Sequence, residues 1–475
     1  MKPIFTLLVS FIILSTCAQS TFDKLYGYEN STTSYSARQT TDGQYVILAG
    51  MSSGWNQNMV TIMLLKLDQF GEIIREDFIE SENIQQGLDF IETEDNGHII
   101  VGSTYSDSGN FNDILLLKAD SIGNIIWQKS YHISDGDLGT SIKRSHDGGY
   151  IISGYTYTYG QQFIYHPILL KTNATGDLEW LNYYEDINGG AMSVIVTSDS
   201  NYVFSGYIDY DNQQQMDLLI RKVKYDGSNI WTKIYGGQDN QIGLNILEYN
   251  NSDLIITGSH SNTNSTHHDS YFLRTTNNGD SIWTRTLGSP RSNYCRSVCI
   301  SNDSNLVLAG NIASGENNSL NTILVKLNSD GDTIWTQKYA ESGQQHRYGR
   351  FVTNTNDNGF FIAGETIGFQ AHKQISAIKT DENGRVDYLA IDENCSPVIS
   401  IYPNPCTDQI NIITKQNIIE IYIYDITGRA VKHITPVSAN NFYSTNGLQY
   451  LDNGLYIIDI KHYNGRSTSK FYKMN

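Results

Sequence analysis

Few residues of this 475-residue chain have the types and spacing that catalysis or metal binding requires. His267, His268 and Asp269 are metal-ligand types, but neighbours on a strand point to opposite faces, and Asn, Ser and Thr residues surround them. The acidic turn at 328–332 lacks the glutamate that closes a calcium loop, because Trp335 stands at that position. Nucleophile, zinc, phosphate and dinucleotide motifs do not stand out. The sequence therefore predicts no catalytic residue, no metal ligand and no cofactor.

Aromatic residues in long polar segments give the clearest indication of a binding surface. Such rings, with amide side chains beside them, suit carbohydrate or protein ligands. The candidate ligand-binding residues are Trp55, Tyr155, Tyr157, Tyr159, Tyr165, Tyr207 and Tyr210. The alternation of Tyr155, Tyr157 and Tyr159 also fits strand residues that pack between neighbouring units of the fold, so both interpretations stay open.

The elements that carry these residues follow a repeat. An apolar strand motif that ends in glycine recurs at intervals of 52 residues, the last interval being 54. Its glycines are Gly50, Gly102, Gly154, Gly206, Gly258, Gly310 and Gly364. A turn glycine recurs with it, at Gly71, Gly123, Gly176, Gly227, Gly279, Gly331 and Gly384. This register indicates one structural unit repeated seven times.

Two further positions recur around each turn glycine. Five residues before it lies a cation, at Lys66, Lys118, Lys171, Lys222, Arg274, Lys326 and Lys379. Four residues after it lie Arg75, Trp127, Trp180, Trp231, Trp283, Trp335 and Tyr388. We expect the cation to pair with acids near the strand edge or turn, and the aromatic ring to pack each unit on its neighbour.

Each unit is predicted to form four β-strands. In one unit these strands are 229–236, 243–249, 253–258 and 271–275, which alternate in polarity and are rich in β-branched and aromatic residues. Seven such units over residues 21–390 predict an all-β fold, a seven-bladed β-propeller. We expect residues 22–27 and 384–391 to meet in one blade and close the ring, which leaves no long free sheet edge.

Strand parity assigns the connections to two faces. Asx-Gly signals such as those at 41–44 and 328–331 predict tight hairpins on one face. Longer segments that differ between units fall on the other face, among them 52–58, 155–166, 207–215 and 259–269. Because variable loops on a rigid scaffold usually carry recognition, this variable-loop face is the predicted binding surface.

The N-terminus has the features of an export signal. A basic start, an apolar run over 4–14 and small residues up to Ser20 predict a signal peptide over residues 1–20. Residues 14–17 also resemble the lipobox of bacterial lipoproteins, although Thr16 departs from that pattern, so lipidation of Cys17 stays open. The apolar run is too short for a membrane span, and we expect no integral membrane segment after the signal is removed.

A small domain follows the repeats. Short alternating strands after a linker at 391–397 predict an Ig-like β-sandwich over 398–475. Cys395 and Cys406 could pair in an oxidising compartment, whereas Cys295 and Cys299 on one strand would lie about 13 Å apart, too far for a disulfide. The motif residues of this domain are Tyr402, Pro403, Asn404, Pro405, Asp408, Gly428, Arg429, Gly454, Tyr456 and Lys470.

In that order, these residues resemble the type A C-terminal sorting domain of the type IX (Por) secretion system. The resemblance implies an interaction with the type IX secretion machinery, carriage across the outer membrane, and removal of the domain. The cargo of such a domain is then released or attached at the cell surface.

The repeats resemble those of quinoprotein-type propellers, with Asn328 to Trp335 as a local example, and the propeller repeats of secreted Bacteroidetes-type proteins. Quinoprotein dehydrogenases typically have eight blades and often adjacent cysteines. The seven units of this chain and its lack of adjacent cysteines mean that the resemblance implies a shared fold and not redox activity.

Charge narrows the range of partners. Fifty acidic against 32 basic residues give a net charge of −18, which disfavours nucleic acid. We therefore predict an exported, non-enzymatic propeller that binds a protein or glycan through its variable-loop face, secreted or held on the outer cell surface. The alternatives are a polysaccharide lyase or hydrolase with its site at the propeller channel, and a structural surface component.

Overall fold

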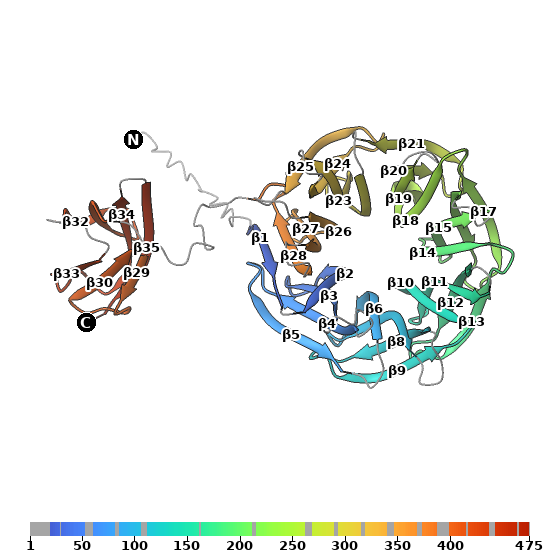
Figure 1. Ribbon diagram of the computed structural model, residues 1–475, viewed down its shortest axis with the longest axis horizontal. Helices are drawn as coiled ribbons and strands as arrows, with labels where there is room; N and C mark the ends of the chain where they lie inside the picture. The colour runs from blue at the N-terminus through green and yellow to red at the C-terminus, as the bar shows by residue number, and fades with distance from the viewer. Residues whose placement is uncertain are drawn as a thin grey trace, which may run out of the picture. The chain divides into compact units, whose positions relative to one another are not determined.

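A computed structural model gives the structure of the chain as two compact units, Met1–Asp387 and Tyr388–Asn475. It describes residues 20–28, 30–52, 60–80, 85–105, 112–160, 163–210, 215–261, 268–288, 293–314, 319–339, 346–367, 373–386, 399–414, 417–436, 442–462 and 465–474. Within these residues the first unit contains seven four-stranded antiparallel sheets. Figure 1 shows them as the blades of one ring, so the predicted seven-bladed propeller is confirmed.

In the first six blades the strands follow one another from the centre of the ring to its rim (Figure 1). The first three blades are β2 (Ser31–Gln39), β3 (Tyr45–Ser52), β4 (Val60–Leu67) and β5 (Ile73–Ile79); β6 (Gln85–Glu92), β7 (His98–Tyr105), β8 (Asn112–Ala119) and β9 (Ile125–Tyr131); β10 (Gly136–Arg144), β11 (Tyr150–Tyr159), β12 (Phe163–Thr172) and β13 (Leu178–Tyr183). The next three are β14 (Gly189–Val196), β15 (Tyr202–Asp209), β16 (Met216–Val223) and β17 (Asn229–Tyr235); β18 (Asn240–Tyr249), β19 (Asp253–Ser261), β20 (His268–Thr275) and β21 (Ser281–Leu287), with the 3-10 turn η1 (Asn250–Ser252); β22 (Asn293–Ile300), β23 (Leu306–Ser314), β24 (Ser319–Leu327) and β25 (Thr333–Tyr339).

The seventh blade closes the ring with a strand from the start of the chain. It contains β26 (His346–Asn354), β27 (Phe360–Ile367), β28 (Lys373–Thr380) and, at the rim, β1 (Phe22–Tyr26). Phe22 is the partner of Lys379, as Trp335 is the partner of Lys326 in the blade before. The prediction that residues 22–27 join the last blade is confirmed, with Phe22 at the aromatic position. Of the predicted partner segment 384–391, residues 387–391 lie outside the described residues.

Six of the seven rim strands pack an aromatic ring on the turn glycine of the next blade. Gly384 has a φ of +70°, and a Cβ added there would lie 2.8 Å from the ring of Trp335. The Tyr339 hydroxyl donates a hydrogen bond of 2.6 Å to the Gly384 carbonyl. The expectation that the recurring aromatic position packs one unit on its neighbour is therefore confirmed.

The recurring cation forms an ion pair within its own blade. Lys222 contacts Asp199 and Lys326 contacts Asp303, each at 2.7 Å, and both aspartates belong to the tight turn between the two innermost strands. The same pairing recurs in the other blades, as Lys66–Asp42, Lys118–Asp95, Lys171–Asp147, Arg274–Asp253 and Lys379–Asp357. This confirms the expected structural role of the cation.

The second unit is a small β-sandwich. One sheet contains β29 (Ile399–Tyr402), β30 (Gln409–Thr414) and β33 (Phe442–Asn446). The other contains β32 (Ala430–Ile434), β31 (Glu420–Asp425), β34 (Gly454–His462) and β35 (Gly465–Lys473). Ile412 of the first sheet and Ile423, Ile458 and Phe471 of the second share one buried core.

Several predictions concern residues outside the described ranges. These are the signal peptide at 1–20 except for its last residue, the linker at 391–397, Trp55, His267 and Cys395. Cys295, Cys299 and Cys406 are free thiols. Within the described part of the chain, no helical segment has the length and apolar character of a membrane-spanning helix.

The closing strand provides a stability test. Phe22 is 6% exposed and packs on Tyr45 and Phe361, with ring centroids 5.9 and 6.3 Å away. We expect Phe22→Ala to lower the free energy of unfolding by about 3 kcal/mol, because it removes a buried ring at the closure. Urea unfolding followed by tryptophan fluorescence measures this for the propeller alone, because every tryptophan precedes residue 388.

Leu25→Ala is the matched control. Leu25 lies on the same strand, is 39% exposed and should cost about 0.5 kcal/mol. Equal losses in the two variants would contradict a specific role for Phe22 in closure.

Candidate functional site

The six predicted aromatic residues that the structure describes lie on two neighbouring blades. Tyr155, Tyr157 and Tyr159 belong to β11 and Tyr165 to β12, whereas Tyr207 belongs to β15 and Tyr210 follows it. The sequence predicted a loop over 155–166, and this prediction is wrong. The segment is chiefly the extended end of a hairpin. The physical reason is cross-strand pairing: Tyr157 lies opposite Tyr165, and Tyr159 opposite Phe163.

The hairpin end forms an aromatic ladder of Tyr157, Tyr159, Phe163 and Tyr165. The ring centroids of Tyr159 and Phe163 are 5.2 Å apart, and those of Tyr157 and Tyr165 are 5.8 Å apart. Tyr159 is 64% exposed and Phe163 is 48% exposed. Sequence reasoning missed Phe163 as an individual residue, although it falls within the segment that was singled out.

The base of the hairpin is buried between blades. The rings of Tyr155 and Tyr207 lie against Gly190, where an added Cβ would be 3.3 Å from the first ring and 3.0 Å from the second. Burial raises the pKa of Tyr155 to about 12. The two interpretations of the Tyr155, Tyr157 and Tyr159 alternation therefore apply to different residues: Tyr155 packs between blades, and Tyr159 faces solvent.

A second feature is the central channel, a cavity of about 390 Å³ lined by the innermost strand of every blade. Each of these strands contains a β-bulge, and the unmatched residue of each bulge lines the channel. These residues are Tyr35, Leu88, Thr140, Met192, Leu244, Arg296 and Arg350.

The recurring strand-end glycine makes room for the bulge. A Cβ at Gly310 would overlap the carbonyl oxygen of Tyr294, and a Cβ at Gly364 would overlap that of Tyr348. Only glycine allows the bulged strand to approach this closely. The glycine repeat thus positions one side chain per blade in the channel.

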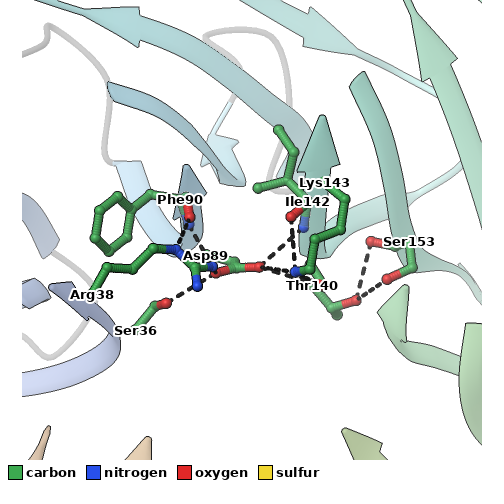
Figure 2. A network of polar contacts seen from close by, with 9 residues as sticks. Ser36, Arg38, Asp89, Phe90, Thr140, Ile142, Lys143 and Ser153 are labelled. Carbon is green, nitrogen blue, oxygen red and sulfur yellow. Dashed lines mark hydrogen bonds and ion pairs between the residues drawn. The ribbon is translucent and has the colours of Figure 1, made fainter. Parts of the chain in front are cut away.

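Asp89 is the centre of a polar network beside the channel, shown in Figure 2. Its carboxylate accepts hydrogen bonds from the Ser36 hydroxyl at 2.9 Å and the Ile142 backbone N–H at 3.1 Å. It also pairs with Arg38 at 3.1 Å and Lys143 at 3.5 Å. The network therefore joins the innermost strands of the first three blades.

The partners of Asp89 stabilise the ionised form of its carboxyl group. Burial opposes ionisation, but the attraction of Lys143 and Arg38 and the hydrogen bonds outweigh it, so the pKa of Asp89 lies below its usual value. Sequence reasoning missed this residue. The repeat could have identified it, because Asp89 is acidic where most units carry Ser or Asn, as at Ser141 and Asn245.

One described group has metal-ligand types in proximity. Atoms of Asp113, His132 and Asp137 lie within 4.8 Å of one another. Asp137 accepts a 2.7 Å hydrogen bond from the Ile133 backbone N–H, and His132 pairs with Asp113 at 2.9 Å. Each of the three side chains thus has a contact within the protein. His268 packs against the ring of Tyr294, with centroids 5.1 Å apart.

The motif residues of the second unit lie mainly in turns and at strand ends. The Asn404 side chain accepts a 2.8 Å hydrogen bond from the Tyr472 N–H, which joins the 402–405 segment to the last strand. Arg429 donates to Asp425 at 3.0 Å across the turn that contains Gly428, whose φ is +82°. The Tyr456 hydroxyl donates to the Asp452 carbonyl at 2.9 Å.

The remaining motif residues belong to the same framework. The peptide bonds before Pro403 and Pro405 are cis, and the Asp408 carbonyl accepts the Leu448 N–H at 2.9 Å. Tyr402 ends β29 and Gly454 begins β34, while Lys470 lies on β35 opposite Ile457.

Comparison with known proteins identifies the second unit. Residues 400–474 match the family model of the secretion system C-terminal sorting domain. The chain therefore carries a type IX sorting domain and is exported, to the outer cell surface or beyond.

One curated relative and several solved structures are similar to this chain. An endo-acting ulvan lyase of Formosa agariphila is 32% identical over 111 residues, which are 22% of this chain and 20% of the relative. PorZ, a bacterial surface component of the type IX secretion system of Porphyromonas gingivalis, has 9% identity and a TM-score of 0.31, covering 95% of this chain and 82% of its own.

The β-propeller domain of the trilobed protease from Pyrococcus furiosus has 9% identity and a TM-score of 0.44, covering 77% and 100% of the two chains. The arabinofuranosidase of Fusarium graminearum has 11% identity and a TM-score of 0.40, covering 76% and 97%. Structural similarities with TM-scores this low support no conclusion about function. The ulvan lyase match spans about a fifth of that relative's length.

Asp89→Asn tests the polar network. We expect this change to lower the free energy of unfolding by about 2–3 kcal/mol, because Arg38, Lys143 and buried donors lose their charged acceptor. Asp95→Asn in the same blade is the control, since the Lys118–Asp95 pair is largely exposed and worth about 0–1 kcal/mol.

The effect of Asp89→Asn should depend on pH with a defined sign. Because folding lowers the pKa of Asp89, its contribution is present above the unfolded pKa of about 4 and is lost as pH falls through the folded pKa. The stability difference between the native chain and the variant should therefore shrink below about pH 4. A difference that stays constant down to about pH 2 would contradict the ionised network.

Proposed function

We propose that the propeller is a binding module that recognises a glycan or a protein through its variable-loop face, with the aromatic ladder as the central contact. The observation that carries this proposal is the exposure of Tyr159 and Phe163 at the end of an ordered hairpin. Exposed rings that stand together on a surface favour ligand contact.

The ladder suits this role energetically. Its rings are held by β-sheet pairing at Tyr157–Tyr165 and Tyr159–Phe163 before any ligand arrives. Ordering these side chains on binding therefore costs little entropy. The exposed ring area can then be buried against the ligand. Sugar rings and protein surfaces both offer apolar patches edged by polar groups, which match tyrosine.

A second candidate function is suggested by the partial match to a polysaccharide lyase. Under this alternative, a polysaccharide-cleaving site would lie at the propeller channel. Asp89 is poorly suited to proton transfer in such a site, because its carboxylate is ionised and both oxygens accept hydrogen bonds or pair with cations. Turnover of a polysaccharide that is abolished by one channel substitution would favour this alternative.

Delivery to the ligand follows from the sorting domain. We propose that residues 1–20 direct the chain to the periplasm and that residues 398–475 are then read by the type IX machinery. The propeller lies upstream of the sorting domain, as cargo does in such chains.

Deletion of residues 398–475 tests this route. The propeller should then accumulate in the periplasm and disappear from the cell surface and the medium, as measured by fractionation and surface protease digestion. The full chain with Tyr159→Ala keeps the sorting domain and should be exported normally. Unchanged export after the deletion would contradict the proposed route.

Double substitution of the ladder tests the binding face. Tyr159→Ala with Phe163→Ala should weaken capture of a ligand, found by screening bacterial and host glycans and surface proteins, by about tenfold to a hundredfold. The fold should be kept, because both side chains are largely exposed.

The control changes two exposed aromatics on the tight-turn face, Phe70→Ala and Tyr225→Ala, which are 56% and 67% exposed. Binding by this control should equal that of the native chain. If the control loses binding and the ladder variant retains it, the variable-loop face is not the binding surface.

A further inference from the structure

The bulge positions of the channel differ sharply in charge around the ring. In the first five blades the unmatched residue is uncharged, whereas in the sixth and seventh it is Arg296 and Arg350. These blades are neighbours, and the Val352 N–H donates to the Ser297 hydroxyl at 3.2 Å across their innermost strands. Two arginines therefore line the channel from neighbouring strands, in a chain whose net charge is −18.

The carboxylates near the channel are already engaged. Asp89 pairs with Arg38 and Lys143, in the first three blades. Glu365 of β27, which is 1% exposed, pairs with Arg350 at 2.7 Å and lies 3.6 Å from Lys373. Within the described residues no ion pair is formed by Arg296.

Arg296 is open to the channel and is electrostatically strained. Its side chain is exposed, and its guanidinium lies 5.9 Å from the centre of the Tyr294 ring. The channel walls partly desolvate the guanidinium, and this desolvation, followed by repulsion from Arg350, lowers the pKa of Arg296. The group remains a cation at neutral pH. An anion placed between the two arginines would relieve this repulsion.

Beside the arginines, the bulge positions of the channel wall are apolar. Met192 and Leu244 occupy the bulge positions of the fourth and fifth blades, and Leu247 lies three residues further along the same strand. A ligand in the cavity would therefore meet guanidinium groups on one stretch of the wall and hydrocarbon on the stretch beside it. A sugar ring that carries an acidic group has both kinds of surface, and a cavity of about 390 Å³ is large enough for such a ligand.

We propose that the channel is a binding site for an acidic sugar, whose carboxylate or sulfate group is held between Arg296 and Arg350. Guanidinium groups bind both anions through paired N–H donors, which gives orientation as well as affinity. This inference rests on the proposed function only in the choice of a sugar as carrier of the anion. The channel site is separate from the aromatic ladder.

The test is thermal unfolding of the purified full chain, followed by tryptophan fluorescence at constant ionic strength adjusted with sodium chloride. The probes are sodium glucuronate, sodium sulfate and glucose. We expect a saturable rise in Tm with an anionic probe and none with glucose, because a ligand that binds only the folded state stabilises it. A stronger response to glucuronate assigns a carboxylate ligand, and a stronger response to sulfate assigns a sulfate ligand.

Arg296→Gln is the decisive variant. It should raise the anion concentration needed for half the Tm shift by about tenfold or more, without lowering the Tm of the free chain. A purely structural arginine would instead lower that Tm when removed. Arg296→Lys keeps the charge but loses the paired donors, so its response should be intermediate.

Lys338→Gln is the matched control. Lys338 is exposed on the rim strand of the same blade, so its removal subtracts one charge without touching the channel. This variant and Tyr159→Ala should respond to anions as the native chain does. Absence of any saturable anion response, or an unchanged response in Arg296→Gln, would overturn the proposal whether or not the aromatic ladder binds its ligand.

Discussion

The contact between a rim-strand ring and the turn glycine of the next blade is the interaction on which the ring of sheets depends. Trp335 on Gly384 and Trp127 on Gly176 show the arrangement, and Phe22 on Gly71 repeats it where the two ends of the ring meet. The left-handed φ of these glycines and the nearness of the ring both exclude a larger residue. A closed ring then leaves each blade packed on two neighbours.

One interface between blades lacks the aromatic ring. Between the first two blades Arg75 takes the aromatic position, and Asp77 lies against Gly123. Arg75 pairs with Asp77 at 2.7 Å, so a polar contact replaces the ring there. Such a substitution is tolerated because the flanking strands are still held by their hydrogen-bonded partners and by the apolar core between the sheets.

A second constraint, at the inner side of each blade, determines what faces the channel. The strand-end glycine accepts a bulge, and the bulge turns one side chain inward. The backbone is thus repeated in every blade while the chemistry is not. Asp89 joins three blades, whereas Arg296 and Arg350 place two cations on neighbouring parts of the channel wall.

The sorting domain is a unit of the chain separate from the propeller. The sorting domain has its own core, and its motif residues hold turns and strand ends together, as Asn404 and Asp425 illustrate. The propeller offers a rigid frame on which a hairpin such as β11–β12 can extend without disturbing the blades. Loops on such a frame change freely, because the core beneath them does not depend on their composition.

The sequence by itself determined the repeat, the four strands of each unit, the ring closure and the sorting domain. These features depend on local patterns, such as strand alternation, turn glycines and ordered motifs, that can be read without knowing spatial neighbours. It also pointed to Tyr159 and its neighbours, although as a loop and not as a paired hairpin that includes Phe163.

The tertiary structure alone decided which residues face the channel. Arg38, Asp89 and Lys143 lie about one repeat apart in the sequence, and a bulge reverses the side-chain alternation from which orientation would be read. Nor could spacing show that Phe22 would take the aromatic position of the last blade, because its partner Lys379 lies at the other end of the ring domain. Such contacts exist only once the ring has closed and brought distant strands together.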